Sequence, residues 1–220
     1  MARGVAAIVE DHSVAGYGLD QIFLRLRARA SSLASGTPVV IGILTTDIDR
    51  AVLWEREAPK PRFVFDARGE LTLETAHLAG PMPAPEARLL TWARLTQYWG
   101  GRLARASGVP HAECRVEEKQ QLAKALLSRI AEVCSDGELR CLVVPFLRAE
   151  DLEREPGWRE RLIESETSAL AQVPMRSVIG EASAHLYRAD RHPSRHQNVL
   201  VGEAIADWVT TTLTAPAQTP

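Results

Sequence analysis

Val39-Val40-Ile41-Gly42-Ile43-Leu44 is an unbroken apolar run dominated by β-branched residues. Such a run is typical of a strand that is buried on both faces of a sheet. Residues 20–34 repeat apolar side chains at helical spacing, and a second apolar run, Val5–Val9, precedes them. The first fifty residues therefore predict strand, helix and strand, which is the unit of a parallel sheet.

The alternation continues to the end of the chain. Helices are predicted over 86–106, 117–133, 150–172 and 201–213, and strands over 139–145 and 175–179. This order predicts an α/β domain with three layers and a mainly parallel sheet. Ligands bind such sheets at the carboxyl ends of the strands, so a site is expected where the loops after the strands meet the start of the last helix.

Residues 55–85 interrupt this order. Pro61–Asp66 and Glu70–Glu74 alternate apolar and polar residues, and Ala67-Arg68-Gly69 between them predicts the turn of a β-hairpin. The segment is too small to bury a core of its own, so it is predicted to be an insertion. We therefore expect a single domain over 1–214 and a frayed tail over 215–220.

Composition excludes several classes of protein. The chain has 220 residues, of which 45% are hydrophobic and 25% charged, as in ordinary globular proteins. A net charge of −2 and 5% aromatic residues argue against nucleic acid or an anionic membrane as a partner. No apolar run reaches the roughly 20 residues that cross a bilayer, and the start is too short in apolar residues for a signal peptide. These features predict a soluble, cytoplasmic protein.

The three cysteines, Cys114, Cys134 and Cys141, show no paired spacing. An odd number without such spacing argues against a disulfide framework and against a zinc knuckle, and predicts free thiols. Cys114 with His111 is a weak nucleophile and base pair, because no third group is in place to orient it. No cofactor is expected from any motif in the chain.

The segment Asp190-Arg191-His192-Pro193-Ser194 leads into the last helix. A carboxylate two residues from a histidine can orient the imidazole and stabilise its protonated form. A polar turn that begins a helix explains the same residues without any chemistry. His192 and His196 are four residues apart and could share a metal ion on a helix, but a third ligand motif is missing.

Three stretches resemble blocks of the SGNH (GDSL-like) hydrolases. They are 190–205, which is similar to the last block, Ser13–Gln21, which is similar to the second, and Val39–Arg50, which is similar to the third. The hairpin that starts at Lys60-Pro61-Arg62-Phe63 resembles an insertion in one branch of that family. The resemblance implies a flavodoxin-like fold and an ester or acyl group, on a small molecule or a larger acylated molecule, as the substrate.

The resemblance also implies roles for four residues. His192 would take the proton of a nucleophilic serine, Asp190 would orient His192, and Gly16 and Thr46 would stabilise the oxyanion. Thr46 stands where the family has asparagine, and losing an oxyanion donor costs about 3 kcal/mol of transition-state stabilisation.

The family's first block, Gly-Asp-Ser, does not occur in this chain. In one alignment Glu10–Tyr17 is an altered first block, with His12 in the place of the nucleophile. In the other the second block is intact, and the first strand and its serine are missing. The 30 residues from Gly16 to Thr46 accommodate one helix and one strand, which favours the second alignment. We therefore expect a hydrolase domain truncated at its amino terminus, with the first strand missing or replaced by residues 4–9.

Two alternatives remain at this point. The chain could be a non-catalytic SGNH-like remnant that binds a partner or a carbohydrate through the hairpin. It could also be an unrelated nucleotide-binding α/β domain, but Gln21 stands where the third glycine of G-x-G-x-x-G would be needed. The sequence does not indicate an oligomeric state.

Overall fold

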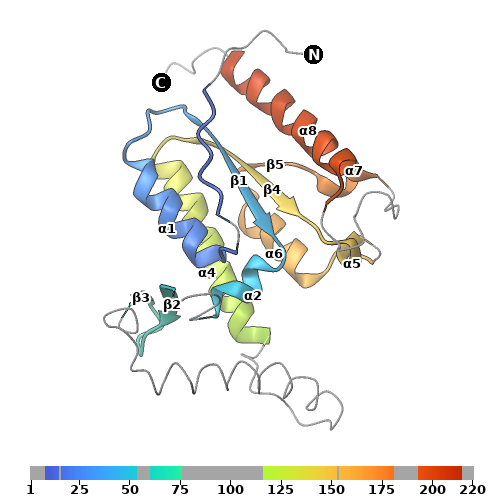
Figure 1. Ribbon diagram of the computed structural model, residues 1–220. Helices are drawn as coiled ribbons and strands as arrows, with labels where there is room; N and C mark the ends of the chain where they lie inside the picture. Colours follow the sequence, from blue (N-terminus) through green and yellow to red (C-terminus); the bar gives the residue numbers. More distant parts are fainter. Residues whose placement is uncertain are drawn as a thin grey trace, which may run out of the picture.

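A computed structural model of the chain describes residues 8–14, 16–53, 60–75, 116–152, 154–180 and 193–214. Its central sheet has three parallel strands in the order β1-β4-β5 (Figure 1). The strands are β1 (Pro38–Leu44), β4 (Arg140–Phe146) and β5 (Ala171–Gln172). β1 and β4 pair along their whole length, from Pro38 opposite Arg140 to Leu44 opposite Phe146.

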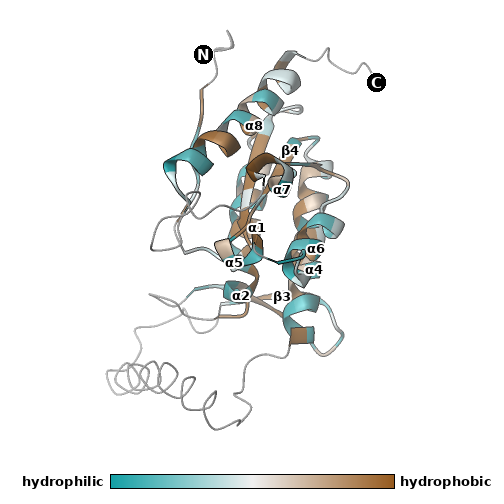
Figure 2. Cartoon of the chain, turned by 90° about the vertical axis from the view of Figure 1, so that its right-hand side faces the viewer, coloured by the Kyte–Doolittle hydropathy of each residue, from teal (hydrophilic) through white to brown (hydrophobic). Residues whose placement is uncertain are grey.

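Helices cover both faces of this sheet (Figures 1 and 2). One face holds α1 (Leu19–Ala30), α4 (Val116–Asp136) and α6 (Trp158–Glu166). The other holds α7 (Met175–Ile179) and α8 (Arg195–Thr214). Two short helices, α2 (Asp47–Ala51) and α5 (Ala149–Leu152), follow β1 and β4 directly. An α/β domain with a parallel sheet is thus confirmed for the described part of the chain.

The larger core lies between β1 and the helices α1 and α4. Leu122, Leu126 and Ile130 recur every fourth residue of α4, as the sequence predicted, and all three are buried. They pack with Ile41 and Ile43 of β1 in one apolar cluster. The spacing of four therefore fixes which face of α4 points to the sheet.

The expectation that β1 is buried on both faces is wrong. Ile41 and Ile43 are buried, but Val40 is 42% and Leu44 is 39% exposed. The reason is the position of β1 at the edge of the described sheet, while the second core on the α8 side gathers around Leu142 and Val144 of β4. On the α8 side, β1 is therefore only partly covered by the described residues.

The described end of the run Val5–Val9, which was expected to be a strand, is not a strand. Ile8 and Val9 lie in an irregular segment and are 97% and 86% exposed, and residues 5–7 lie outside the described ranges. Apolar β-branched side chains at such exposure bury nothing against the domain. The described part of this run, residues 8 and 9, contributes no strand to the sheet.

The hairpin is confirmed. β2 (Arg62–Phe65) and β3 (Leu71–Glu74) are antiparallel, with Phe65 opposite Leu71. The turn is held by Asp66, whose carboxylate accepts the backbone N–H groups of residues 68 and 70, and Gly69 adopts a left-handed φ of 77°. The ring of Phe63 lies 5.4 Å from that of Phe23 on α1, so the hairpin is packed onto the domain.

Two predictions for the carboxyl half are wrong. Met175–Ile179 is the helix α7 and not a strand, because Met175 and Ile179, four residues apart, point into the same core. The charged stretch 150–172 is not one helix, since Pro156-Gly157 separates α5 from α6. The helix expected over 86–106 lies outside the described residues.

Cys134 and Cys141 form a disulfide, so the expectation of free thiols is wrong for this pair. Cys134 lies in the last turn of α4, and Cys141 is the second residue of β4. The tight turn between the helix and the strand brings their Cα atoms to 6.1 Å, within the range that a disulfide can bridge. No described helix is long and apolar enough to cross a membrane.

Candidate functional site

The turn that contains Gly16 lies against the helix that follows Thr46. A Cβ atom on Gly18 would lie 2.8 Å from the backbone nitrogen of Ala51 in α2, so only glycine fits this approach. The Arg50 side chain donates a hydrogen bond to the Tyr17 carbonyl at 3.4 Å. The structure thus brings the loops of two predicted site residues, Gly16 and Thr46, together at the carboxyl end of β1.

Asp47 fixes the loop after β1. One carboxylate oxygen accepts the Leu44 backbone N–H at 2.8 Å, and the other accepts a guanidinium N–H of Arg50 at 2.6 Å. Asp47 is buried, and hydrogen bonds to a buried charged group are the stronger kind. Asp47 and Arg50 therefore set the position of Thr46 relative to the glycine turn.

The residues of the Gly16–Gln21 motif each have a local structural role. Gly16 adopts a left-handed φ of 88°, which glycine permits without strain. Gln21 caps the start of α1 by accepting the Gly18 N–H at 3.3 Å. Leu19 lies in the core, and Asp20 binds Lys60, which ties the hairpin segment to α1. No described residue accepts a hydrogen bond from the Gly16 N–H.

The Asp20 and Lys60 pair is buried among these elements. Burial raises the pKa of Asp20, and the Lys60 charge opposes this shift. Burial lowers the pKa of Lys60, and the Asp20 charge opposes that shift in turn. Each group therefore depends on the other to stay ionised inside the protein.

A second loop reaches the same edge of the sheet. Thr45 donates its hydroxyl hydrogen to Asp151 at 2.7 Å, and the same carboxylate oxygen of Asp151 accepts the Arg148 N–H at 2.9 Å. Arg176 binds the Asp151 carbonyl at 2.8 Å and both carboxylate oxygens of the buried Glu160. These bonds hold the loop after β4 beside the loop after β1.

The last helix begins at this edge too. Its far end is bound to the start of β4, where the Arg140 guanidinium donates to the Thr212 carbonyl. The helix α8 therefore runs opposite to β4, and its first residues lie near the carboxyl end of that strand. Ser194 caps this start by accepting the Gln197 N–H at 3.3 Å.

Asp190 and His192 lie outside the described residues, three positions and one position before Pro193, where the described chain resumes. The structure therefore shows where the chain enters α8 but not where these two side chains lie. The weak pair His111 and Cys114 is also outside the described ranges. Within those ranges no group of three metal-binding side chains occurs, and His196 stands exposed in the first turn of α8.

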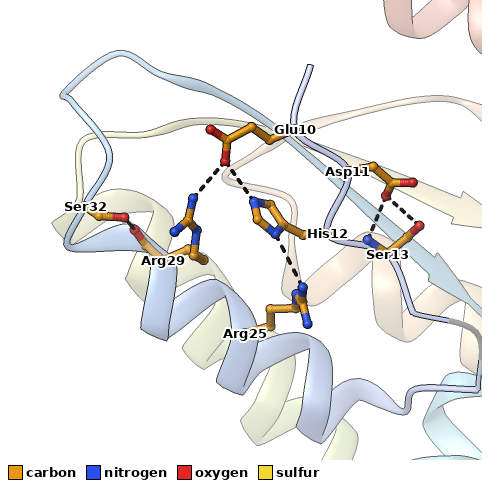
Figure 3. A network of polar contacts seen from close by, with 7 residues as sticks. All are labelled: Glu10, Asp11, His12, Ser13, Arg25, Arg29 and Ser32. Carbon is orange, nitrogen blue, oxygen red and sulfur yellow. Dashed lines mark hydrogen bonds and ion pairs between the residues drawn. The ribbon is translucent and has the colours of Figure 1, made fainter. Parts of the chain in front are cut away.

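Ser13 and His12 do not form a nucleophile and base pair (Figure 3). The Ser13 hydroxyl donates to Asp11 at 2.6 Å, while the His12 ring lies 3.1 Å from Glu10 and 3.4 Å from Arg25. The hydrogen bonds from His12 and from Arg29 lower the pKa of Glu10, and those from the hydroxyl and the N–H of Ser13 lower the pKa of Asp11. Glu10 and His12 attach this segment to α1 at the surface, through Arg29 and Arg25.

Sequence reasoning missed most of the residues that build this edge. Asp47 and Arg50 lie within the Val39–Arg50 stretch but were given no role, and Asp151 and Arg176 belong to no motif. The one available signal was a carboxylate placed three residues after a predicted strand, where it can accept the last backbone N–H. The partners of Asp151 and Arg176 are far away in the sequence, so no local sequence pattern predicts these contacts.

No family model, no curated protein and no solved structure matches the chain.

Proposed function

We propose that this chain is an SGNH-type hydrolase domain that acts on an ester or acyl group at the carboxyl end of β1. In this proposal Gly16 and Thr46 stabilise the oxyanion, His192 is the base and Asp190 orients it. The nucleophilic serine is carried by a further strand that pairs with the edge of β1 that no described strand occupies, called the open edge below. That open edge is the observation on which the proposal rests.

The backbone pairing of β1 shows which groups are open. Thr37 accepts the Arg140 N–H, and Thr45 donates its own N–H to Phe146, so odd-numbered residues of β1 face β4. Even-numbered residues then face away, because hydrogen bonds alternate between the two sides of a strand in a parallel ladder. The N–H groups of Val40 and Gly42 have no acceptor among the described residues. An apolar sheet edge of this kind is suited to accept a further strand.

The exposure of side chains on β1 is consistent with its unpaired backbone N–H groups. Val40 and Leu44 lie on the face of β1 that α8 covers only in part, and they are 42% and 39% exposed. Residues 10–12 bind Arg29 and then Arg25, so this segment runs opposite to α1 and in the same direction as β1 (Figures 1 and 3). It makes no backbone hydrogen bond to β1. The outer backbone groups of β1 are therefore not used by this described segment.

Asp47 defines where such a strand would have to turn. Its carboxylate already occupies the Leu44 N–H, so the added strand could pair with Val40 and Gly42 but no further. A parallel strand that stops there would end next to the loops of Gly16 and Thr46. A residue in the turn after that strand would thus reach the proposed oxyanion donors.

The chemistry of the proposed site is acyl transfer through serine. The serine oxygen attacks the carbonyl carbon, and His192 takes the serine proton and later gives it to the leaving group. The negative charge on the carbonyl oxygen is met by the Gly16 N–H and the Thr46 hydroxyl. Thr46 is half-buried, and its hydroxyl does not cap α2, so in this proposal it donates to the oxyanion. Water then releases the acyl group from the serine.

The test compares the 220-residue chain with a form extended by the codons that lie in frame upstream of Met1. We expect these codons to encode an apolar strand followed by Gly-Asp-Ser. Only the extended form should hydrolyse p-nitrophenyl acetate, and His192→Ala should abolish this activity. His196→Ala is the matched control and should leave the rate unchanged, since His196 has no role in the proposed reaction.

Two results would overturn the proposal. An in-frame stop codon directly upstream of Met1 would favour the alternative of a non-catalytic binding domain. Hydrolysis by the 220-residue chain that disappears in Ser13→Ala would place the nucleophile in the exposed segment that binds α1, which contradicts the proposed arrangement.

A further inference from the structure

The disulfide between Cys134 and Cys141 lies away from the proposed site. It joins the end of α4 to the start of β4, and both cysteines are buried. The helix α4 supplies the centre of the main core, and β4 is the middle strand of the described sheet. The covalent link therefore fastens two elements on which the whole domain depends.

The turn between the two cysteines is built to hold them at this separation. Backbone N–H groups of Gly137, Glu138 and Leu139 bind the carbonyls of Val133, Ser135 and Cys134, respectively. Glu138 adopts a positive φ of 49°, which tightens the turn, and its carbonyl accepts the Gly36 N–H just before β1. The two sulfur atoms are thus brought together by ordered backbone, and the fold requires no rearrangement to join them.

We propose that this domain acquires its disulfide, and acts, in an oxidising compartment outside the cytosol. Buried structural disulfides persist where the surroundings are oxidising, while cytosolic thiols are kept reduced. The bond is shielded from small reductants in the folded protein. This inference replaces the cytoplasmic location expected from the sequence and does not depend on the proposed hydrolase activity.

Formation of the bond needs an oxidant of the protein-disulfide class. The thiolate of one cysteine attacks the disulfide of such an oxidoreductase, and a mixed disulfide forms as one oxidant sulfur leaves. The second thiolate then displaces the other oxidant sulfur. Two electrons pass to the oxidant, which ends as a dithiol, and the two cysteine sulfurs end bonded to each other. Because both sulfurs are buried in the folded chain, we place this exchange before α4 packs against β4.

The direct test traps thiols in the cells that make the protein. Cells are quenched in acid and treated with N-ethylmaleimide, and the protein is then reduced and labelled with a maleimide of higher mass. We expect Cys134 and Cys141 to carry the second label, which marks them as oxidised in the cell. Finding both blocked by N-ethylmaleimide would overturn the proposal.

A second measurement concerns the purified chain. Reduction should shift the urea midpoint to lower concentration and raise the unfolding equilibrium constant on the order of 100-fold, as expected for a short loop that loses its cross-link. Cys134→Ala should show the same midpoint with or without reductant. Cys114→Ala is the matched control and should keep the response to reductant. An unchanged midpoint of the original chain after reduction would contradict a structural role, whatever the result for ester hydrolysis.

Discussion

Lys60 donates a hydrogen bond to the Asp20 carboxylate, and both side chains are withdrawn from solvent. Lys60 opens the hairpin segment, and Asp20 belongs to the first turn of α1. One ion pair therefore connects the inserted hairpin to the start of α1. The glycine turn of the proposed site directly precedes α1. The start of α1 therefore helps to position both the hairpin and the proposed site.

Lys60→Met should lower the free energy of unfolding by about 3–5 kcal/mol, because it leaves the Asp20 carboxylate buried without its cation. Lys124→Met is the control, since Lys124 is 3.8 Å from Glu166 and largely exposed. A surface pair of this kind is worth about 0–1 kcal/mol. Urea unfolding followed by tryptophan fluorescence measures both values. Equal losses in the two variants would show that the pair at Lys60 is not buried.

Gly18→Ala should destabilise the domain by about 1–3 kcal/mol, as overpacking typically does. The added methyl group would meet the backbone of Ala51 and Arg50 at 2.8 Å, and backbone atoms cannot move aside cheaply. Gly202→Ala on α8 is the matched substitution, because no atom lies within 4 Å of its Cβ position. It should stabilise α8 by about 0.5–1 kcal/mol through helix propensity. Thermal unfolding that moves in the same direction for both variants would contradict the close approach at Gly18.

Asp47→Ala should remove two hydrogen bonds to a buried carboxylate, each worth about 1.5–3 kcal/mol. Asp49→Ala is the neighbouring control. Asp49 is one-third exposed and binds Lys119 at 3.4 Å and Arg159 at 2.9 Å, so its loss should cost no more than about 1 kcal/mol. Chemical denaturation compares the two. Hydrogen exchange at Leu44 should also speed up in Asp47→Ala only, and an unchanged rate there would exclude the proposed role of Asp47.

Val40→Lys should change stability by less than about 0.5 kcal/mol in the 220-residue chain, because its side chain is 42% exposed at the edge of the described sheet. Ile41→Ala, one residue along the strand, should cost about 2–5 kcal/mol, since it opens a cavity in the core. In the extended form tested above, Val40→Lys should become clearly destabilising if a further strand covers this face. Equal tolerance of lysine in both forms would argue against that strand.

The periodic elements were the predictable part of this fold. Leu122, Leu126 and Ile130 repeat at the helical period along α4, and the hairpin strands alternate around a glycine turn, so local spacing alone located them. The strand β1 was located as well, but its burial was not. An apolar run indicates how hydrophobic a strand is and contains no information about whether a neighbour covers it.

Long-range partners were the unpredictable part. The disulfide joins residues seven apart through a helix end and a turn, a spacing that matches no cysteine motif. The hydrogen bond from Thr45 to Asp151 joins residues 106 positions apart, and no sequence pattern near either residue indicates the other. Of the proposed site, the loops of Gly16 and Thr46 were expected to meet because the family resemblance gives both residues a role at one oxyanion.

Gly42 lies under the ring of Phe146, and a Cβ atom at this position would come to 3.0 Å from one ring carbon. A larger residue at position 42 is therefore compatible only with a smaller or shifted side chain at position 146. Among related chains, these two alignment columns should covary, with glycine opposite an aromatic residue in some members and alanine or serine opposite an aliphatic residue in others. Such paired exchange would allow the register of β1 against β4 to be recognised from sequences alone.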